Sequence, residues 1–182
     1  MSARPSARRE LRLGTADMHD RVDAIFSHAD LGTTDGYGRF LAAQAAAHLA
    51  VEDALSEAGA DRVVPDWNSR KRSALLLDDL DKMGVTPPPR PQHDAGTTPA
   101  AIIGGIYVLE GSRLGGSVLK NSVAPGLPAR FLSASDPASW RRLIEIIDAR
   151  LTTADEIAEA VDAARAVFTT FEQSGRKFLR VN

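Results

Sequence analysis

A histidine near the start of the chain has the residue type and the setting of a metal ligand. His19 lies within TADMHDRVD, on a stripe of residues that recur at the spacing of one helix face. The other members of this stripe are Leu11, Thr15, Met18, Val22, Ile25 and Phe26. An imidazole among apolar side chains must satisfy two ring nitrogens, so one could bind a metal and the other a hydrogen-bond acceptor. Asp23, one helical turn further on, could be that acceptor; a half-buried histidine paired with Asp23 alone is the simpler alternative.

The second chemical feature is a run of glycines in GGIYVLEGSRLGGSVL, a stretch expected to form a helix. Its glycines are Gly104, Gly105, Gly111, Gly115 and Gly116. Each glycine costs a helix about 1 kcal/mol relative to alanine, which calls for a packing or functional reason. Gly111 and Gly115 share a face, so they leave a bare groove for something large and flat, and they permit a bend. Close packing against another helix is the alternative, as is a helix that ends at Gly115 and Gly116.

The two motifs are specific when they occur together. TADMHDRVDAIF and YVLEGSRLGGSVL resemble the proximal and distal helix signatures of haem oxygenases, with the nearest likeness to the bacterial, phytochrome-associated branch. The resemblance covers most of the chain. It implies an all-α fold, a multi-helical bundle that holds haem between a proximal N-terminal helix and a glycine-rich, kinked distal helix.

Residue roles follow from this resemblance. It implies that His19 is the proximal iron ligand, that Asp23 is its acidic partner, and that Arg12 lies near a haem propionate. The residues expected to act on the distal side are Gly111, Ser112 and Gly115, and those expected to contact haem are Arg12, Thr15, His19, Tyr107, Gly111, Gly115, Gly116, Arg176 and Lys177. Ser112 stands where the animal enzymes carry an aspartate that organises distal water.

The implied reaction is oxidative degradation of haem b, both cofactor and substrate, to biliverdin, carbon monoxide and ferrous iron. Imidazole ligation leaves the iron one open position for dioxygen. Electrons must come from an external donor such as a ferredoxin or a flavoprotein reductase, and a bacterial phytochrome could receive the biliverdin. Two alternatives stay open: a haem-binding or haem-storage protein on the same fold, made conceivable by Ser112, and a different helical protein in which His19 is structural.

Other polar residues give weaker signals. His48 and Glu52 are four apart, a spacing that can bind a metal, but a metal site in a helical bundle needs a matching pair elsewhere. We therefore expect them to form an exposed polar pair. His93 lies in a predicted loop and is expected to face solvent. Arg8 and Arg12 are one helical turn apart and could pair with haem carboxylates.

The elements that must position these residues are helices and loops, with no convincing strand. The expected helices run from Ser6 to Ser27, from a cap at Thr33–Asp35 to Gly59, from Ser69 to Met83, from Thr97 or Thr98 through the glycine run, from Asp136 through Ile147, and from Thr153 through Phe171. Two breakers, VTPPPRPQHDAGTTP and NSVAPGLPA, predict loops that are too short to separate domains. Residues 1–182 are therefore expected to form a single haem oxygenase-like domain.

Composition excludes several other classes. The net charge of −2 shows no overall excess of positive charge of the kind that nucleic-acid-binding proteins carry. The absence of cysteine excludes disulfides, thiolate haem ligation and iron–sulfur clusters within the chain, and fits a reducing cytoplasm. No apolar run follows the charged N-terminus, and none is long enough to span a bilayer. We expect a cytoplasmic protein with no signal peptide and no nucleic-acid or membrane partner.

Overall fold

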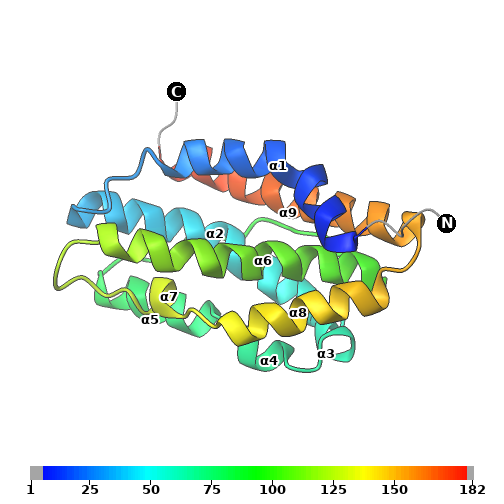
Figure 1. Ribbon diagram of the computed structural model, residues 1–182. Helices are drawn as coiled ribbons and strands as arrows, with labels where there is room; N and C mark the ends of the chain where they lie inside the picture. Colours follow the sequence, from blue (N-terminus) through cyan, green and yellow to red (C-terminus); the bar gives the residue numbers. More distant parts are fainter. Residues whose placement is uncertain (1–5, 180–182) are drawn as a thin grey trace.

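Helices account for all regular secondary structure in residues 6–179, the part of the chain that the computed structural model describes. They are α1 (Ala7–Phe26), α2 (Thr34–Glu57), α3 (Ala60–Val63), α4 (Trp67–Arg70), α5 (Ser73–Lys82), α6 (Pro99–Leu119), the 3-10 turn η1 (Lys120–Ser122), α7 (Arg130–Ser133), α8 (Pro137–Arg150) and α9 (Ala154–Phe178) (Figure 1). The all-α prediction is confirmed. None of the helices in this range combines the length and the apolar character needed to cross a membrane.

Three of the long helices, α2, α6 and α9, begin where the sequence predicts a cap. The hydroxyl oxygen of Thr33 accepts a backbone N–H at the start of α2, and that of Thr98 does the same for α6, with Pro99 as the first helical residue. At the start of α9, Thr153 and Glu156 form a reciprocal capping box. These side chains satisfy N–H groups that have no partner inside the helix, so each start is encoded locally.

The single helix predicted over 69–83 is wrong, because the chain forms two helices there. α4 ends at Arg70 and α5 begins at Ser73. The backbone N–H groups of Arg72 and Ser73 donate to the carboxylate of Glu52 in α2, over 2.8 and 3.1 Å. A carboxylate from a distant helix therefore caps α5, which fixes where the helix begins.

The single-turn helices α3 and α7 form in segments for which the sequence predicts no helix. The start of α7 is held in the same way as that of α5. Asp79 of α5 is buried, and its carboxylate accepts the N–H groups of Arg130 and Phe131 over 3.1 and 2.8 Å. The starts of α5 and α7 thus both depend on acidic side chains that lie far away in the sequence.

α9 supports the helices that carry the predicted site residues, because it packs against α1, α2 and α6 (Figure 1). Glycines permit the closest of these approaches. A Cβ atom at Gly14 of α1 would lie 2.6 Å from the side chain of Val161, and one at Gly104 of α6 would collide with the backbone of Ala160. Among the described residues, α1 and α6 make few direct contacts with each other. α9 thus holds two helices that leave space between them.

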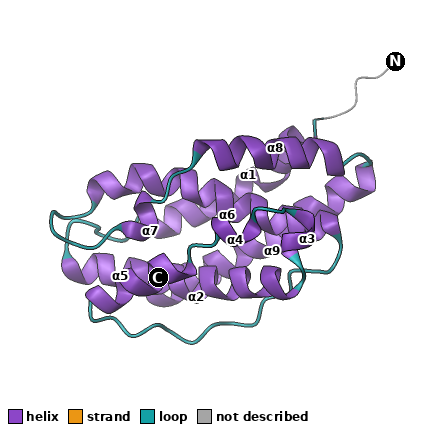
Figure 2. Ribbon diagram, turned by 90° about the horizontal axis from the view of Figure 1, so that it is seen from below, coloured by secondary structure: helices purple, strands orange, loops and turns teal. Residues whose placement is uncertain are grey.

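The long loop between α5 and α6 runs alongside α2 (Figure 2). Arg90 of this loop forms an ion pair with Asp53 of α2. His93 is half-buried, and its Nδ1 atom lies 3.0 Å from Oγ1 of Thr170 in α9. The expectation that His93 faces solvent is therefore wrong, because the loop is pressed against two helices.

Candidate functional site

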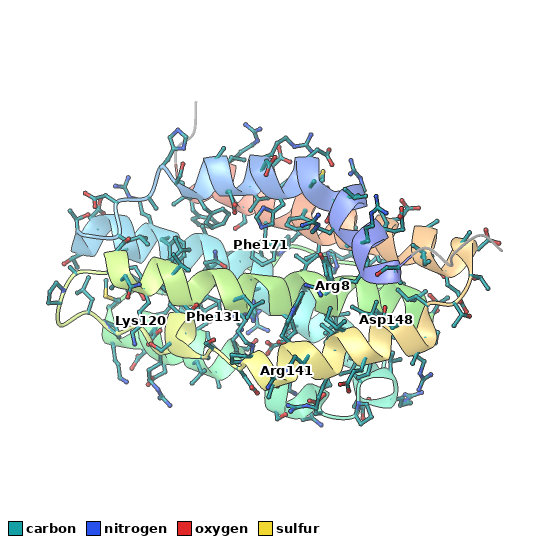
Figure 3. All side chains as sticks on the ribbon, viewed as in Figure 1. Arg8, Lys120, Phe131, Arg141, Asp148 and Phe171 are labelled. Carbon is teal, nitrogen blue, oxygen red and sulfur yellow. The ribbon has the colours of Figure 1, made fainter. Side chains whose placement is uncertain are left out.

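A cavity of about 450 Å³ lies between α1 and α6, a volume in the range of small-molecule sites. Its lining consists of Arg12, Thr15, Ala16, His19, Asp20, Val22, Asp23 and Phe26 from α1, Phe40 and Gln44 from α2, Tyr107, Val108, Gly111, Ser112, Leu114, Gly115, Gly116 and Leu119 from α6, Trp140 from α8, and Phe168 and Phe171 from α9. Phe171 is labelled between α1 and α6 in Figure 3. The cavity brings together the predicted residues of the N-terminal helix and of the glycine helix.

His19 faces this cavity from α1. Its Nδ1 atom lies 3.2 Å from Oδ2 of Asp23, and its ring meets the ring of Phe168 edge-on, with centroids 6.0 Å apart. The side chain is 59% exposed, because it faces the cavity instead of packed side chains. Asp23 therefore engages one ring nitrogen, and the imidazole stays accessible from the cavity.

The glycines of α6 divide into two groups with different surroundings. Cβ atoms at Gly111 and Gly115 would have no heavy atom within 4 Å, so these two present bare backbone to the cavity. Cβ atoms at Gly104, Gly105 and Gly116 would instead meet the backbone of α9, a side chain of α2 and a side chain of α7. α6 stays α-helical through the whole run. A flat macrocycle such as haem fits the wall at Gly111 and Gly115, where no side chain projects.

Positive charge gathers near Tyr107, another residue of the cavity wall. Burial raises the pKa of Tyr107, and the charges of Arg8 and Arg12 act in the opposite direction. Arg12 itself lines the cavity, and Arg8 lies near the start of α1 (Figure 3). The rings of Tyr107 and Trp140 lie 5.8 Å apart. This part of the cavity suits a ligand that carries carboxylates.

Thr15 lines the cavity as well, but its hydroxyl group is already engaged. Oγ1 of Thr15 donates to the carbonyl oxygen of Leu11, one turn back in α1, over 2.7 Å. The hydroxyl group of Thr15 therefore has no free proton to donate to the cavity, and only its oxygen lone pairs remain as acceptors.

Arg176 and Lys177 do not line the cavity. Arg176 binds Glu172 within α9, with Nη2 3.0 Å from Oε1. The Nζ atom of Lys177 lies 5.4 Å from the centroid of the Phe178 ring. The structure thus separates these two cations from the other predicted haem contacts.

His48 and Glu52 are buried, so the expectation of an exposed pair is wrong. Nε2 of His48 lies 3.0 Å from Oε2 of Glu52. α2 is enclosed by α5, α6 and α9, so its polar residues face the interior as well. Burial lowers the pKa of His48. Burial alone would raise the pKa of Glu52, but the hydrogen bonds from His48 and from the backbone before α5 lower it to about 2.

Sequence reasoning missed several residues of the cavity. Gln44 and Trp140 line it, and Gln44 carried a usable signal, since it is a polar residue within the apolar stripe of its helix. Asp20 of α1 also lines the cavity. Trp140 and Phe168 had no such signal, because apolar side chains at helical spacing look the same whether they face a core or a ligand.

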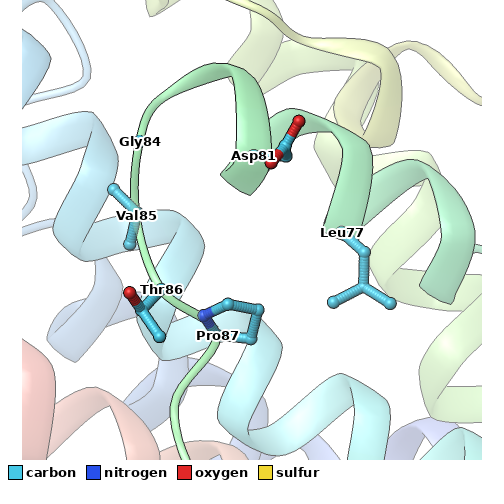
Figure 4. A pocket seen from close by; sticks show the side chains of 6 residues that line it. All are labelled: Leu77, Asp81, Gly84, Val85, Thr86 and Pro87. Carbon is cyan, nitrogen blue, oxygen red and sulfur yellow. The ribbon is translucent and has the colours of Figure 1, made fainter.

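A second hollow of about 460 Å³ lies between the end of α5 and the loop that follows (Figure 4). It is lined by Leu77, Asp81, Gly84, Val85, Thr86 and Pro87. It contains none of the predicted site residues. Within residues 6–179, no group of three or more metal-binding side chains comes together. The cavity between α1 and α6 therefore remains the candidate functional site.

Residues 6–179 thus form an all-helical structure with a cavity between two helices. The chain is 34% identical to a heme oxygenase of Xanthomonas campestris pv. campestris (strain 8004) over 132 residues, 66% of this chain and 76% of that protein. It is 26% identical to heme oxygenase PigA of Pseudomonas aeruginosa over 172 residues, 88% of this chain and 87% of that protein.

Solved structures agree with the sequence comparison. The NO- and CO-bound heme oxygenase from Neisseria meningitidis matches with a TM-score of 0.81 and 25% identity, over 97% of this chain and 92% of that chain. No protein-family model matches the chain. The chain belongs to the haem oxygenase family, and it is an enzyme of haem degradation.

Proposed function

We propose that this chain binds haem in the cavity between α1 and α6 through His19, and that it converts haem to biliverdin, carbon monoxide and ferrous iron. When bound, haem supplies the redox chemistry, using dioxygen and external electrons to oxidise its own macrocycle. One observation carries the proposal. The imidazole of His19 and the bare backbone at Gly111 and Gly115 face a single cavity from two different helices.

The role of His19 rests on its pairing with Asp23. Nδ1 lies 3.2 Å from a carboxylate oxygen of Asp23, and this negative charge favours a proton on Nδ1, which leaves the lone pair of Nε2 for the iron. The edge contact with Phe168 restricts rotation of the ring. Asp23 thus holds the neutral imidazole in the tautomer that a metal ligand needs.

The distal wall and the charged end of the cavity orient the ligand. Because Gly111 and Gly115 project no side chain, a planar ring can approach the backbone of α6 closely. Arg12 lines the cavity and offers a guanidinium group to a haem propionate. The positive charge of Arg12 also acts to lower the pKa of Tyr107, so Tyr107 lies at the same charged end of the cavity. Arg176 and Lys177 contribute less, since they do not line the cavity.

The partners that we propose follow from the reaction. The chain has no cysteine, so it holds no iron–sulfur cluster through cysteine thiolates. We propose that a ferredoxin or a flavoprotein reductase supplies the electrons in the cytoplasm. Biliverdin could then pass to a bacterial phytochrome.

The test begins with haem added to the purified protein, where a visible spectrum should show one-to-one binding. Reductant in air should then bleach the haem band while biliverdin absorption rises and carbon monoxide is released. His19→Ala should abolish the imidazole-ligated spectrum and turnover, and added imidazole should restore part of each. A parental spectrum and activity in that variant would contradict the role of His19. Haem that is bound but returns unchanged to the ferric form would contradict turnover.

A further inference from the structure

A buried guanidinium group lies directly behind the wall of the haem cavity. Arg72, between α4 and α5, is only 2% exposed. Its Nη2 atom donates to the carbonyl oxygen of Leu109 over 2.9 Å and to Oγ of Ser112 over 2.8 Å, both in α6. Its Cζ atom lies 4.6 Å from the centroid of the Phe131 ring, which is labelled in Figure 3. Arg72 does not line the cavity itself, but it contacts Ser112, which does.

The charge of Arg72 is not paired directly. Two neighbouring arginines, Arg70 and Arg113, both bind the carboxylate of Glu110. Among the described residues, Arg72 forms no ion pair of its own. The nearby carboxylate of Glu52 instead pairs with His48 and accepts hydrogen bonds from two backbone N–H groups. Burial and the charge of Arg113 lower the pKa of Arg72 to about 9, so the guanidinium is still charged at neutral pH.

The hydrogen bonds of Ser112 leave its hydroxyl group without a free donor. A serine hydroxyl has one proton and two lone pairs. Its proton is directed to the carbonyl oxygen of Leu109, 2.7 Å away, and one lone pair accepts from Arg72. Only one lone pair remains, so Ser112 can accept a hydrogen bond from the cavity but cannot donate one while these contacts persist.

We propose that Arg72 is a positioning residue of the distal wall: it holds Ser112 as an acceptor, and its buried charge favours an anionic ligand on that side of the cavity. The proposal rests on the function proposed above, with haem bound between α1 and α6. A charge in a poorly solvated interior acts over a longer range than a surface charge, because little water screens it. Arg72 thus acts on an anionic ligand through its electric field, and it keeps Ser112 from donating a hydrogen bond to the cavity.

The experiment compares an anionic and a neutral ligand on the ferric haem complex. Azide and imidazole are titrated into the parent protein and into Arg72→Met, Arg72→Gln, Arg72→Lys and Ser112→Ala, with binding followed in the visible spectrum above the pKa of free imidazole. Arg141→Met is the matched control, since it removes an exposed arginine of α8 (Figure 3). Thermal unfolding without haem shows which variants keep the fold.

Arg72→Met and Arg72→Gln should bind azide about tenfold more weakly, a difference of about 1.4 kcal/mol, with imidazole affinity unchanged. Arg72→Lys and Arg141→Met should stay within about twofold of the parent, because the first keeps the buried charge and the second removes only a screened one. Ser112→Ala should also stay within about twofold, since the hydroxyl donates nothing to the ligand.

Parental azide affinity in both neutral variants would overturn the electrostatic role. If neither neutral variant folds, Ser112→Ala decides, because an azide loss there would show that the hydroxyl donates and would overturn its assignment as an acceptor. A parent protein that binds no haem would instead refute the proposed function, which separates the two failures.

Discussion

The Nδ1 atom of His19 lies 3.2 Å from Oδ2 of Asp23, one helical turn further along α1. Both side chains line the cavity, and both are largely exposed. An exposed ion pair contributes little to stability, so this contact has little value for the fold. The contact instead matters for the orientation of the imidazole, because it engages one ring nitrogen and leaves the other available.

We predict that Asp23→Asn weakens haem binding by about tenfold, the lower end of the loss seen when the partner of a metal-bound histidine is removed. Haem titration followed in the visible spectrum measures this. Asp20→Asn is the matched control, because Asp20 is another α1 carboxylate that lines the same cavity. Equal losses in the two variants would show that local negative charge, and not the pairing with His19, is responsible.

The two groups of glycines in α6 predict opposite effects on the stability of the haem-free protein. Gly104→Ala should lower the free energy of unfolding by about 1–3 kcal/mol or more, because its Cβ atom would collide with the backbone of Ala160. Gly111→Ala should raise it by up to about 1 kcal/mol, since alanine favours the helix and the space is open. Chemical denaturation measures both. Equal destabilisation would refute the division into packing and cavity glycines.

Gly111→Leu should reduce haem turnover by about a hundredfold while the haem-free protein keeps its melting temperature. The leucine side chain would enter the space in which the ligand must lie, since nothing else occupies it. Ser112→Ala should have a much smaller effect on turnover. Full conversion by Gly111→Leu, together with a lowered melting temperature, would return this glycine to a structural role.

Arg12→Met should weaken haem binding by up to about fivefold, the limit for an exposed ion pair, and the loss should diminish at high salt. Arg176→Met should leave haem affinity unchanged, because Arg176 binds Glu172 away from the cavity. Haem titrations at two salt concentrations check the comparison. A larger effect at Arg176 would place the propionates at the other end of the site.

His48 should make the fold sensitive to mild acid. Burial holds its pKa below the value of 6.5 that it has when solvated. As the pH falls below about 6.5, the unfolded chain takes up a proton that the folded protein does not, so the free energy of unfolding decreases. Glu52, with its pKa lowered to about 2 from 4.5, adds a further loss below pH 4.5.

His48→Gln should therefore flatten the dependence of unfolding free energy on pH between about 5 and 6.5. Part of the slope should remain, because burial also lowers the pKa of His93. Denaturant unfolding at a series of pH values measures this. An unchanged slope would mean that His48 takes up its proton at the same pH in the folded and the unfolded chain, which would contradict a lowered pKa.

The sequence by itself determined the elements that are encoded locally. The caps at Thr33, Thr98 and Thr153 are confirmed because each bonds a backbone group within a few residues. The spacing that placed His19 and Asp23 one turn apart is likewise a property of a single helix. The two helix motifs were also enough to indicate the family. That residues 1–182 form one domain stays a prediction.

Tertiary structure decided everything that depends on a partner far away in the chain. The break at Arg72 and the start of α7 arise because Glu52 and Asp79 cap them from other helices. Gly104 and Gly111 are chemically identical residues on one helix, and only the position of α9 makes the first a packing contact and leaves the second bare. Periodicity shows which residues share a face, but what lies opposite that face is set by the packing of the whole fold.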